Sequence, residues 1–228
     1  MSGVSLSVMN IKKIKKEDFQ KESFSLERQA TFDNWGNEVK ELGLPKTEIK
    51  NCFKLGEYAH YKAKMSTETI KEPIYIYEDG FYECTSGYQK IKAFDFLINE
   101  NFTTLYTFAP KQVVETFIKR LKKEGCMNCS DLPFDFSKLG ELENLDSAWG
   151  VWEDSKGTIK RIAKFGKGIE SEIEDYSSIT TFYIDYIYNG NPIQLILGLD
   201  GRISTQRDIK QKDIFNIYND ISGTLLKR

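Results

Sequence analysis

Two turn dipeptides between residues 189 and 201 constrain the fold more than any other feature of the sequence. Asn189-Gly190 and Asp200-Gly201 each separate two apolar segments rich in β-forming residues. Both dipeptides accept the positive backbone angles that a two-residue hairpin turn requires. They therefore predict that strands at 181–188, 192–199 and 202–206 form an antiparallel meander.

The segments around this meander complete a predicted sheet with helices beside it. Strands are predicted at 148–153 and 159–165, and a polar helix at 168–178. Asp208 is a suitable cap for a closing helix, because Ile214, Ile217, Tyr218 and Ile221 follow it on one stripe. Residues 132–228 are therefore expected to form an α+β domain with an antiparallel sheet.

The middle of the chain predicts a hairpin, a helix, a strand and a second helix. Asp79-Gly80 lies between two β-forming runs, which indicates a hairpin over 74–85. A helix is predicted over 89–99, where the apolar residues make a broad helical face, and a strand over 103–108. The clearest helix follows Pro110, and it carries an apolar stripe that ends at Gly125.

The first part of the sequence predicts mainly helix. Apolar residues recur at loosely helical spacing between 16 and 42, and Gly43 and Pro45 end that run. Thr47 is a possible cap for a second helix with Ile49, Phe53, Ala59 and Ala63 on one side. The expected fold is thus α+β: a helical N-terminal region, a hairpin/helix/strand/helix middle and a C-terminal meander flanked by helices. A boundary near residue 132 divides it into domains 1–131 and 132–228.

Composition sets limits on location and stability. A chain of 228 residues buries enough apolar surface to fold without disulfides or metal. Its apolar runs are far shorter than the roughly 20 residues of a membrane-spanning helix, and its first residues lack the order of a secretory signal. Four cysteines are too few for a disulfide scaffold. We therefore expect a cytoplasmic protein with no membrane partner.

Catalytic and cofactor motifs are incomplete. The single histidine, His60, lies in a segment predicted to be helical and has no local nucleophile or orienting acid. Gly166-Lys167-Gly168 follows a predicted strand but lacks the full spacing of a phosphate-binding loop. Cys126 and Cys129 are separated by two residues, which makes them weak candidates for half of a zinc or redox site. We expect no cofactor and favour a non-catalytic protein, with a dispersed carboxylate or cysteine site as an enzymatic alternative.

Basic residues indicate a possible nucleic-acid surface, although the chain balances 32 basic against 34 acidic residues. Five of them lie largely off the apolar stripe of the helix after Pro110: Lys111, Lys119, Arg120, Lys122 and Lys123. A second basic group comprises Lys12, Lys13, Lys15 and Lys16. Clustered lysines of this kind suit nucleic-acid phosphates.

Aromatic residues, at 13% of the chain, indicate protein docking. Alternation along a strand places Trp149 and Trp152 on opposite faces, so one of them is expected at the surface. Tyr75 and Tyr77 share one face of the first predicted hairpin. The leading hypothesis is therefore a regulatory, adaptor or assembly subunit that binds another protein, and the alternative is a nucleic-acid-binding subunit.

Overall fold

The structure is a computed structural model, and its described residues fall into two compact units. Unit 1 contains residues 1–10, 106–111 and 130–228, and unit 2 contains residues 11–105 and 112–129. The boundary expected between residues 131 and 132 concerns independent folding and stays a prediction. The structure describes residues 3–28, 31–32, 38–39, 45–70, 74–78, 81–85, 88–153, 159–165 and 179–226.

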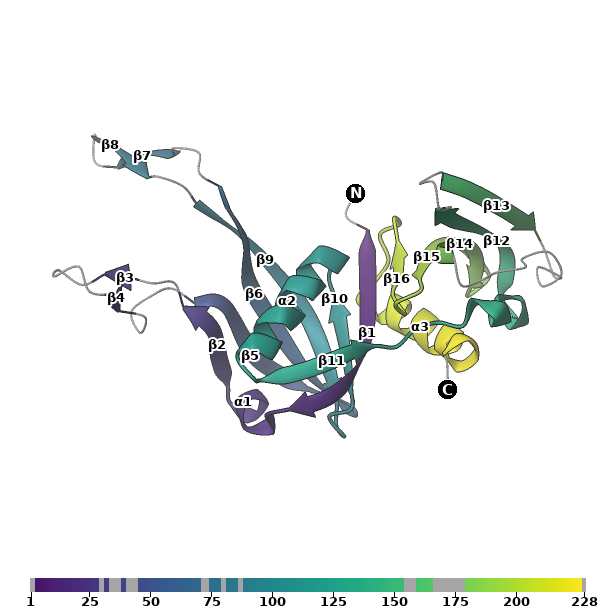
Figure 1. The fold of residues 1–228 in the computed structure, drawn as a ribbon, viewed down its shortest axis with the longest axis horizontal. Helices are drawn as coiled ribbons and strands as arrows, with labels where there is room; N and C mark the ends of the chain where they lie inside the picture. Colours follow the sequence, from purple (N-terminus) through teal and green to yellow (C-terminus); the bar gives the residue numbers. More distant parts are fainter. Residues whose placement is uncertain are drawn as a thin grey trace. The chain divides into compact units, whose positions relative to one another are not determined.

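Unit 2 is built on an antiparallel sheet with the strand order β10-β9-β6-β5-β2 (Figure 1). Two further strand pairs, β3 with β4 and β7 with β8, are inserted between its strands in the sequence. The elements that contribute to this unit are β1 (Val4–Ile14), α1 (Lys16–Gln20), β2 (Ser23–Arg28), β3 (Thr31–Phe32), β4 (Glu38–Val39), β5 (Pro45–Leu55), β6 (Tyr58–Ile70), β7 (Ile74–Glu78), β8 (Phe81–Thr85), β9 (Tyr88–Asn99), β10 (Thr104–Phe108), α2 (Lys111–Lys123) and β11 (Met127–Asp131).

Unit 1 contains an antiparallel sheet with the order β13-β12-β14-β15-β16-β1. Strands β1, β10 and β11 contribute residues to both units, and Lys111, the first residue of α2, belongs to unit 1. The remaining elements are η2 (Phe136–Glu141), β12 (Leu145–Glu153), β13 (Ile159–Phe165), β14 (Ile179–Tyr188), β15 (Asn191–Gly198), β16 (Ile203–Thr205) and α3 (Gln211–Leu225).

One long helix packs on each sheet. In unit 2, α2 lies against the sheet, and the ring of Phe117 contacts Phe94 and Phe96 of β9 at 5.1 and 5.3 Å between centroids. In unit 1, the stripe that the sequence predicts on α3 is buried in a core with strands β14 and β15. Each helix therefore has one apolar face, as its spacing of apolar residues requires.

The expected helical N-terminal region is wrong, because the described residues there are mostly β-strand. Residues 47–63 form the β5–β6 hairpin, and Gly56, with φ of +57°, lies in its turn. A β-bulge at Cys52 is the physical reason for the error. The extra residue turns Phe53 to the face opposite buried Ile49, so the apolar residues of β5 do not keep the period of two that identifies a strand.

Two other predicted helices are also replaced. Among the described residues between 16 and 42, only Lys16–Gln20 are helical, and β2 begins at Ser23. Residues 89–99 belong to β9, which pairs with β6 along its length. Phe94, Phe96 and Ile98 alternate as a strand requires, but Leu97 between them is buried too, so the run resembles a helix.

Several local predictions are confirmed. The hairpin over 74–85 and the helix over 111–123 are present, and so is every predicted strand from residue 103 onwards. The closing helix forms as α3, although its cap position is Lys210 and not Asp208. The helix expected at 168–178 lies outside the described residues.

Candidate nucleic-acid interface

The exposed side of α2 carries three of the lysines that the sequence indicates. Val114, Phe117 and Leu121 bury one face of the helix against the sheet. Lys119, Lys122 and Lys123 are exposed on that outer side. Lysines in the last turn also interact favourably with the helix dipole, which helps α2 to tolerate their mutual repulsion.

Arg120, from the same predicted group, has a structural role in unit 2. Its guanidinium donates to the carbonyl oxygens of Lys46 and Ser66, at 2.8 and 2.7 Å, and to the hydroxyl of Thr47 at 2.9 Å. These acceptors belong to β5 and β6. Arg120 thus ties α2 to two strands of the sheet.

Lys111 belongs to unit 1, where its ammonium group lies 3.2 Å from a carboxylate oxygen of Asp200. The two residues line an open hollow of about 590 Å³ together with Arg202 and the threonines at 180 and 181. Neither Asp200 nor Arg202 belongs to a motif in the sequence, because Asp200 is part of the Asp200-Gly201 turn dipeptide. The hollow is lined by both acidic and basic side chains, so its charge does not favour an anion.

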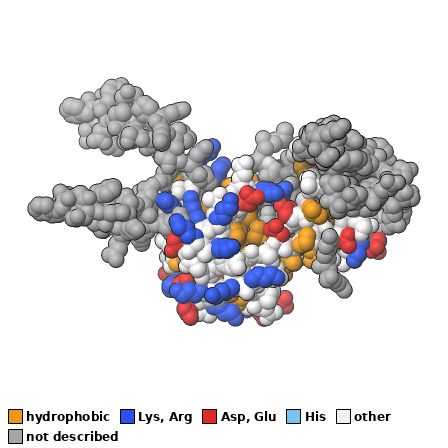
Figure 2. Space-filling model, in the orientation of Figure 1, with side chains coloured by type: hydrophobic (Ala, Val, Ile, Leu, Met, Phe, Trp, Pro, Cys, Tyr) orange, Lys and Arg blue, Asp and Glu red, His pale blue; other side chains and the backbone are white. Residues whose placement is uncertain are grey.

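The two basic groups of the sequence are brought together in unit 2. The Lys15 amide donates to the carbonyl of Cys126 at 2.8 Å, just after α2 ends, and β1 pairs with β11. Figure 2 shows lysine and arginine side chains gathered over this region. We define the lysine surface as the exposed residues Lys12, Lys13, Lys16, Lys119, Lys122 and Lys123.

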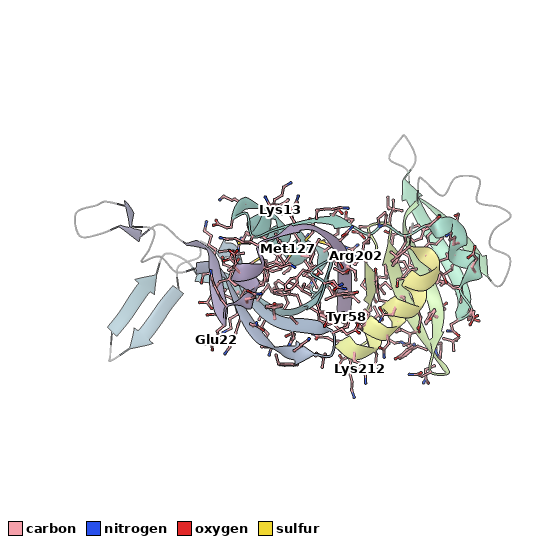
Figure 3. The ribbon with its side chains drawn as sticks, turned by 90° about the horizontal axis from the view of Figure 1, so that it is seen from below. Lys13, Glu22, Tyr58, Met127, Arg202 and Lys212 are labelled. Atoms are coloured by element: carbon pink, nitrogen blue, oxygen red, sulfur yellow. The ribbon has the colours of Figure 1, made fainter. Side chains whose placement is uncertain are left out.

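Buried residues lie beneath the lysine surface, and its lysines point to solvent. Met127 of β11 is buried, whereas Lys13 of β1 is exposed (Figure 3). Lys16 lies over the ring of Phe102 at 4.9 Å from its centroid. Across unit 2, the described side chains include 16 lysines and arginines against 9 aspartates and glutamates. The local potential is therefore positive although the whole chain is slightly acidic.

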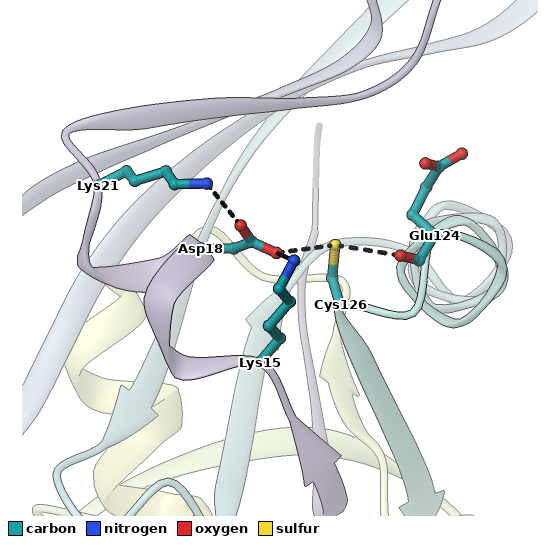
Figure 4. A network of polar contacts seen from close by, with 5 residues as sticks. All are labelled: Lys15, Asp18, Lys21, Glu124 and Cys126. Atoms are coloured by element: carbon teal, nitrogen blue, oxygen red, sulfur yellow. Dashed lines mark hydrogen bonds and ion pairs between the residues drawn. The ribbon is translucent and has the colours of Figure 1, made fainter.

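A buried carboxylate anchors α1 at the edge of this surface (Figure 4). Asp18 accepts a hydrogen bond from Lys21 at 2.7 Å, and Lys15 lies 3.7 Å away. The hydrogen bond from Lys21 is the main reason that the pKa of Asp18 is lowered. The thiol of Cys126 donates to the other oxygen of Asp18 at 3.6 Å. Asp18 thus joins the start of the chain to the segment after α2.

The cysteine pair does not resemble a reactive site. Cys126 and Cys129 lie at and after the start of β11, and burial raises their pKa values to about 11 and about 12. Both thiols are therefore protonated at neutral pH, which disfavours nucleophilic chemistry. Within the described part of the chain, no three His, Cys, Asp or Glu residues are grouped to hold a metal ion.

His60 lies on β6 and not on a helix. Its Nε2 is 2.8 Å from a carboxylate oxygen of Asp95 on β9, and its ring contacts Phe53 at 4.7 Å between centroids. Its Nδ1 is buried and has no hydrogen-bond partner among the described residues. This geometry holds the ring in place but brings no nucleophile to it.

The aromatic candidates fall into two groups. Trp149 stacks on Tyr183, its partner on β14, at 5.5 Å between centroids and 6° between ring planes, and both are half-buried. Their neighbours Ala148 and Phe182 are buried, so the stacked pair is on the outer face of the unit 1 sheet. The side chains of Trp152, Tyr75 and Tyr77 lie outside the described part of the structure.

Unit 2 has a further polar surface that was not predicted from the sequence. Lys50, Lys62 and Lys64 are exposed on β5 and β6, next to His60 and Phe53. The alternation of buried Ala63 and Met65 with exposed lysines was a signal for it. The mistaken helical interpretation concealed that pattern.

Comparison with models of known protein families found no match, and comparison with curated proteins found no similar sequence. The described helices include none that is long and apolar enough to cross a membrane.

Proposed function

We propose that this chain is a non-catalytic subunit of a nucleoprotein complex, and that unit 2 binds nucleic-acid phosphates through the lysine surface. The observation that carries the proposal is the backbone hydrogen bond from Lys15 to Cys126, which brings the lysine group of residues 12–16 close to the end of α2, about 100 residues away in the sequence. Each group alone is an ordinary solvated surface. Together they present six exposed ammonium groups on β1, α1 and α2, which suits a polyanion.

Arg120 and Lys111 are not expected to contact phosphates. Both have protein acceptors in the structure. The expected phosphate contacts therefore include Lys119 and Lys122 of α2 and the lysines of β1 and α1. The chain would hold nucleic acid within an assembly.

The test is the affinity of the full chain for a labelled oligonucleotide at about 0.1 M salt. Each phosphate contact contributes about 0.7 to the logarithmic salt slope of a single strand, which corresponds to about fivefold in affinity at 0.1 M salt. The double substitution Lys119→Gln and Lys122→Gln should therefore weaken binding about 25-fold.

The matched control removes two exposed lysines from unit 1, Lys210→Gln and Lys212→Gln. This variant has the same net charge and should bind within about twofold of the unmodified chain. Equal losses in both double variants would mean that only net charge matters and would refute the proposed surface. Absence of binding at about 0.05 M salt would refute the function itself.

A second function, docking on another protein, is favoured by the stacked pair Trp149–Tyr183. Half-exposed tryptophan and tyrosine are frequent anchors of protein interfaces. The test is recovery of the tagged chain from its native host. A stoichiometric protein partner that is lost with Trp149→Ala but retained with Gln194→Ala, an exposed neighbour on β15, would support this function. Retention in both variants would refute docking through this pair.

A further inference from the structure

The β5–β6 surface of unit 2 combines positive charge with an exposed aromatic ring. We define it by Lys50, Phe53, His60, Lys62 and Lys64. It is on the face of the sheet opposite α2, because Ile49, Ala63 and Met65, which alternate with these residues, are buried on the helix side. The lysine surface, in contrast, lies on α2, α1 and β1.

Two of the three lysines of this surface, Lys50 and Lys62, are arranged unfavourably for a protein alone, whereas Lys64 is the cross-strand partner of the exposed Glu48. Lys50 and Lys62 are direct cross-strand partners, and both are exposed. Like charges directly opposite each other destabilise a sheet. Asp95 is the partner of Lys62 on the other side, but one of its carboxylate oxygens lies 2.8 Å from His60. A bound anion would relieve the repulsion between the two ammonium groups.

The aromatic part of the surface is placed there by the bulge in β5. The extra residue, Cys52, shifts the register so that Phe53 pairs with His60 on the open face. Phe53 is 55% exposed, although a phenylalanine is usually buried. The ring of His60 meets it at 66°, and Asp95 fixes the orientation of His60. Phe53 is thus a rigid exposed ring beside a row of lysines.

These features fit one class of ligand. A stacking ring next to positive charge is the arrangement that binds unpaired bases, since every base has a π-face and each nucleotide carries a phosphate. Lys62 and Lys64 follow His60 by two and four residues, which is about 7 and 13 Å along a strand. That span covers a few nucleotides of a single strand. Bases within a duplex are already stacked and leave no face for Phe53.

We propose that the β5–β6 surface binds single-stranded nucleic acid, with a base stacked on Phe53 and phosphates at Lys50, Lys62 and Lys64. This inference deepens the proposed function and rests on it, because it names the form of nucleic acid that unit 2 selects. The lysine surface contacts phosphates of any nucleic acid, whereas the β5–β6 surface provides the preference for unpaired bases.

The experiment measures binding of the full chain to a labelled oligothymidine of about 12 nucleotides and to a duplex of the same length. Phe53→Ala should weaken binding to the single strand by about 5- to 150-fold, the usual loss of one stacked base, without changing the salt slope. Lys62→Gln should instead lower the slope by about 0.7. Neither substitution should change duplex binding by more than about twofold.

Leu55→Ala is the matched control, because Leu55 is also 55% exposed on β5 and is aliphatic. It should change affinity less than about twofold, and Phe53→Trp should retain the affinity of the unmodified chain. Equal effects of Phe53→Ala and Leu55→Ala would overturn the inference.

The double variant of Lys119 and Lys122 separates the two proposals. Loss of binding in that variant, with no effect of Phe53→Ala, would overturn the inference and leave the proposed function intact. If the unmodified chain binds neither oligonucleotide, both proposals are refuted together.

Discussion

Replacing Arg120 by methionine should destabilise the protein and leave its nucleic-acid contacts in place. The Arg120 guanidinium makes three hydrogen bonds, at 2.7 to 2.9 Å, to acceptors on β5 and β6. Hydrogen bonds from a charged donor contribute about 1.5 to 3 kcal/mol each. Because one side chain makes all three, their effects are not additive. We expect a loss of about 3 to 4 kcal/mol in the free energy of unfolding.

The loss arises from the acceptors that Arg120 leaves behind. Thr47 is completely buried, so its hydroxyl cannot exchange Arg120 for water without rearrangement. Methionine preserves most of the aliphatic packing, which isolates the polar contribution. Urea unfolding measures the effect as a shift in midpoint at constant slope.

Lys119→Met is the control on the same helix, because Lys119 is exposed. It should alter the free energy of unfolding by less than about 0.5 kcal/mol. If Arg120→Met were as stable as the unmodified chain but bound oligonucleotides more weakly, Arg120 would be a ligand-binding residue, and the reasoning would be refuted.

Two further predictions concern local geometry and pH. Gly201 has φ of +82°, and a Cβ there would meet the carbonyl oxygen of Leu132, so Gly201→Ala should lower the free energy of unfolding by more than about 1 kcal/mol. Gly223 on α3 has open space around it, so Gly223→Ala should raise the free energy of unfolding by up to about 1 kcal/mol. Thermal unfolding of both variants checks this, and equal effects would contradict it. Asp18→Asn should lower the free energy of unfolding by about 1 kcal/mol at neutral pH. Because the pKa of Asp18 is lowered on folding, its stabilisation is present above the unfolded value of about 4 and lost as pH falls through the folded pKa. The difference between Asp18→Asn and the unmodified chain should therefore shrink below about pH 4 in urea titrations, and a constant difference would be inconsistent with this account.

The fold was predictable where sequence neighbours determine it. The stripe of α2 depends on Val113, Val114, Phe117 and Leu121, which meet within one helix, and the strands of unit 1 are defined by their own turns. The first 100 residues were not predictable in the same way. The bulge at Cys52 and the burial of Leu97 disturb the alternation of β5 and β9, and only pairing with distant strands resolves the period.

The candidate site was predictable in part. Exposure of Lys119, Lys122 and Lys123 follows from the helical period alone. The roles of Arg120 and Lys111 depend on acceptors more than 50 residues away, which no local pattern reveals. The position of Lys15 close to the end of α2 likewise depends on a long-range contact, its backbone hydrogen bond to Cys126.

The salt dependence of oligonucleotide binding by the full chain tests the central claim most directly. If all six residues of the lysine surface contact phosphates of a single strand, the logarithm of the binding constant should fall with a slope of about −4 against the logarithm of salt concentration. That slope corresponds to about a 300-fold loss of affinity between 50 and 200 mM salt. A slope flatter than about −1, or no binding at low salt, would contradict the claim.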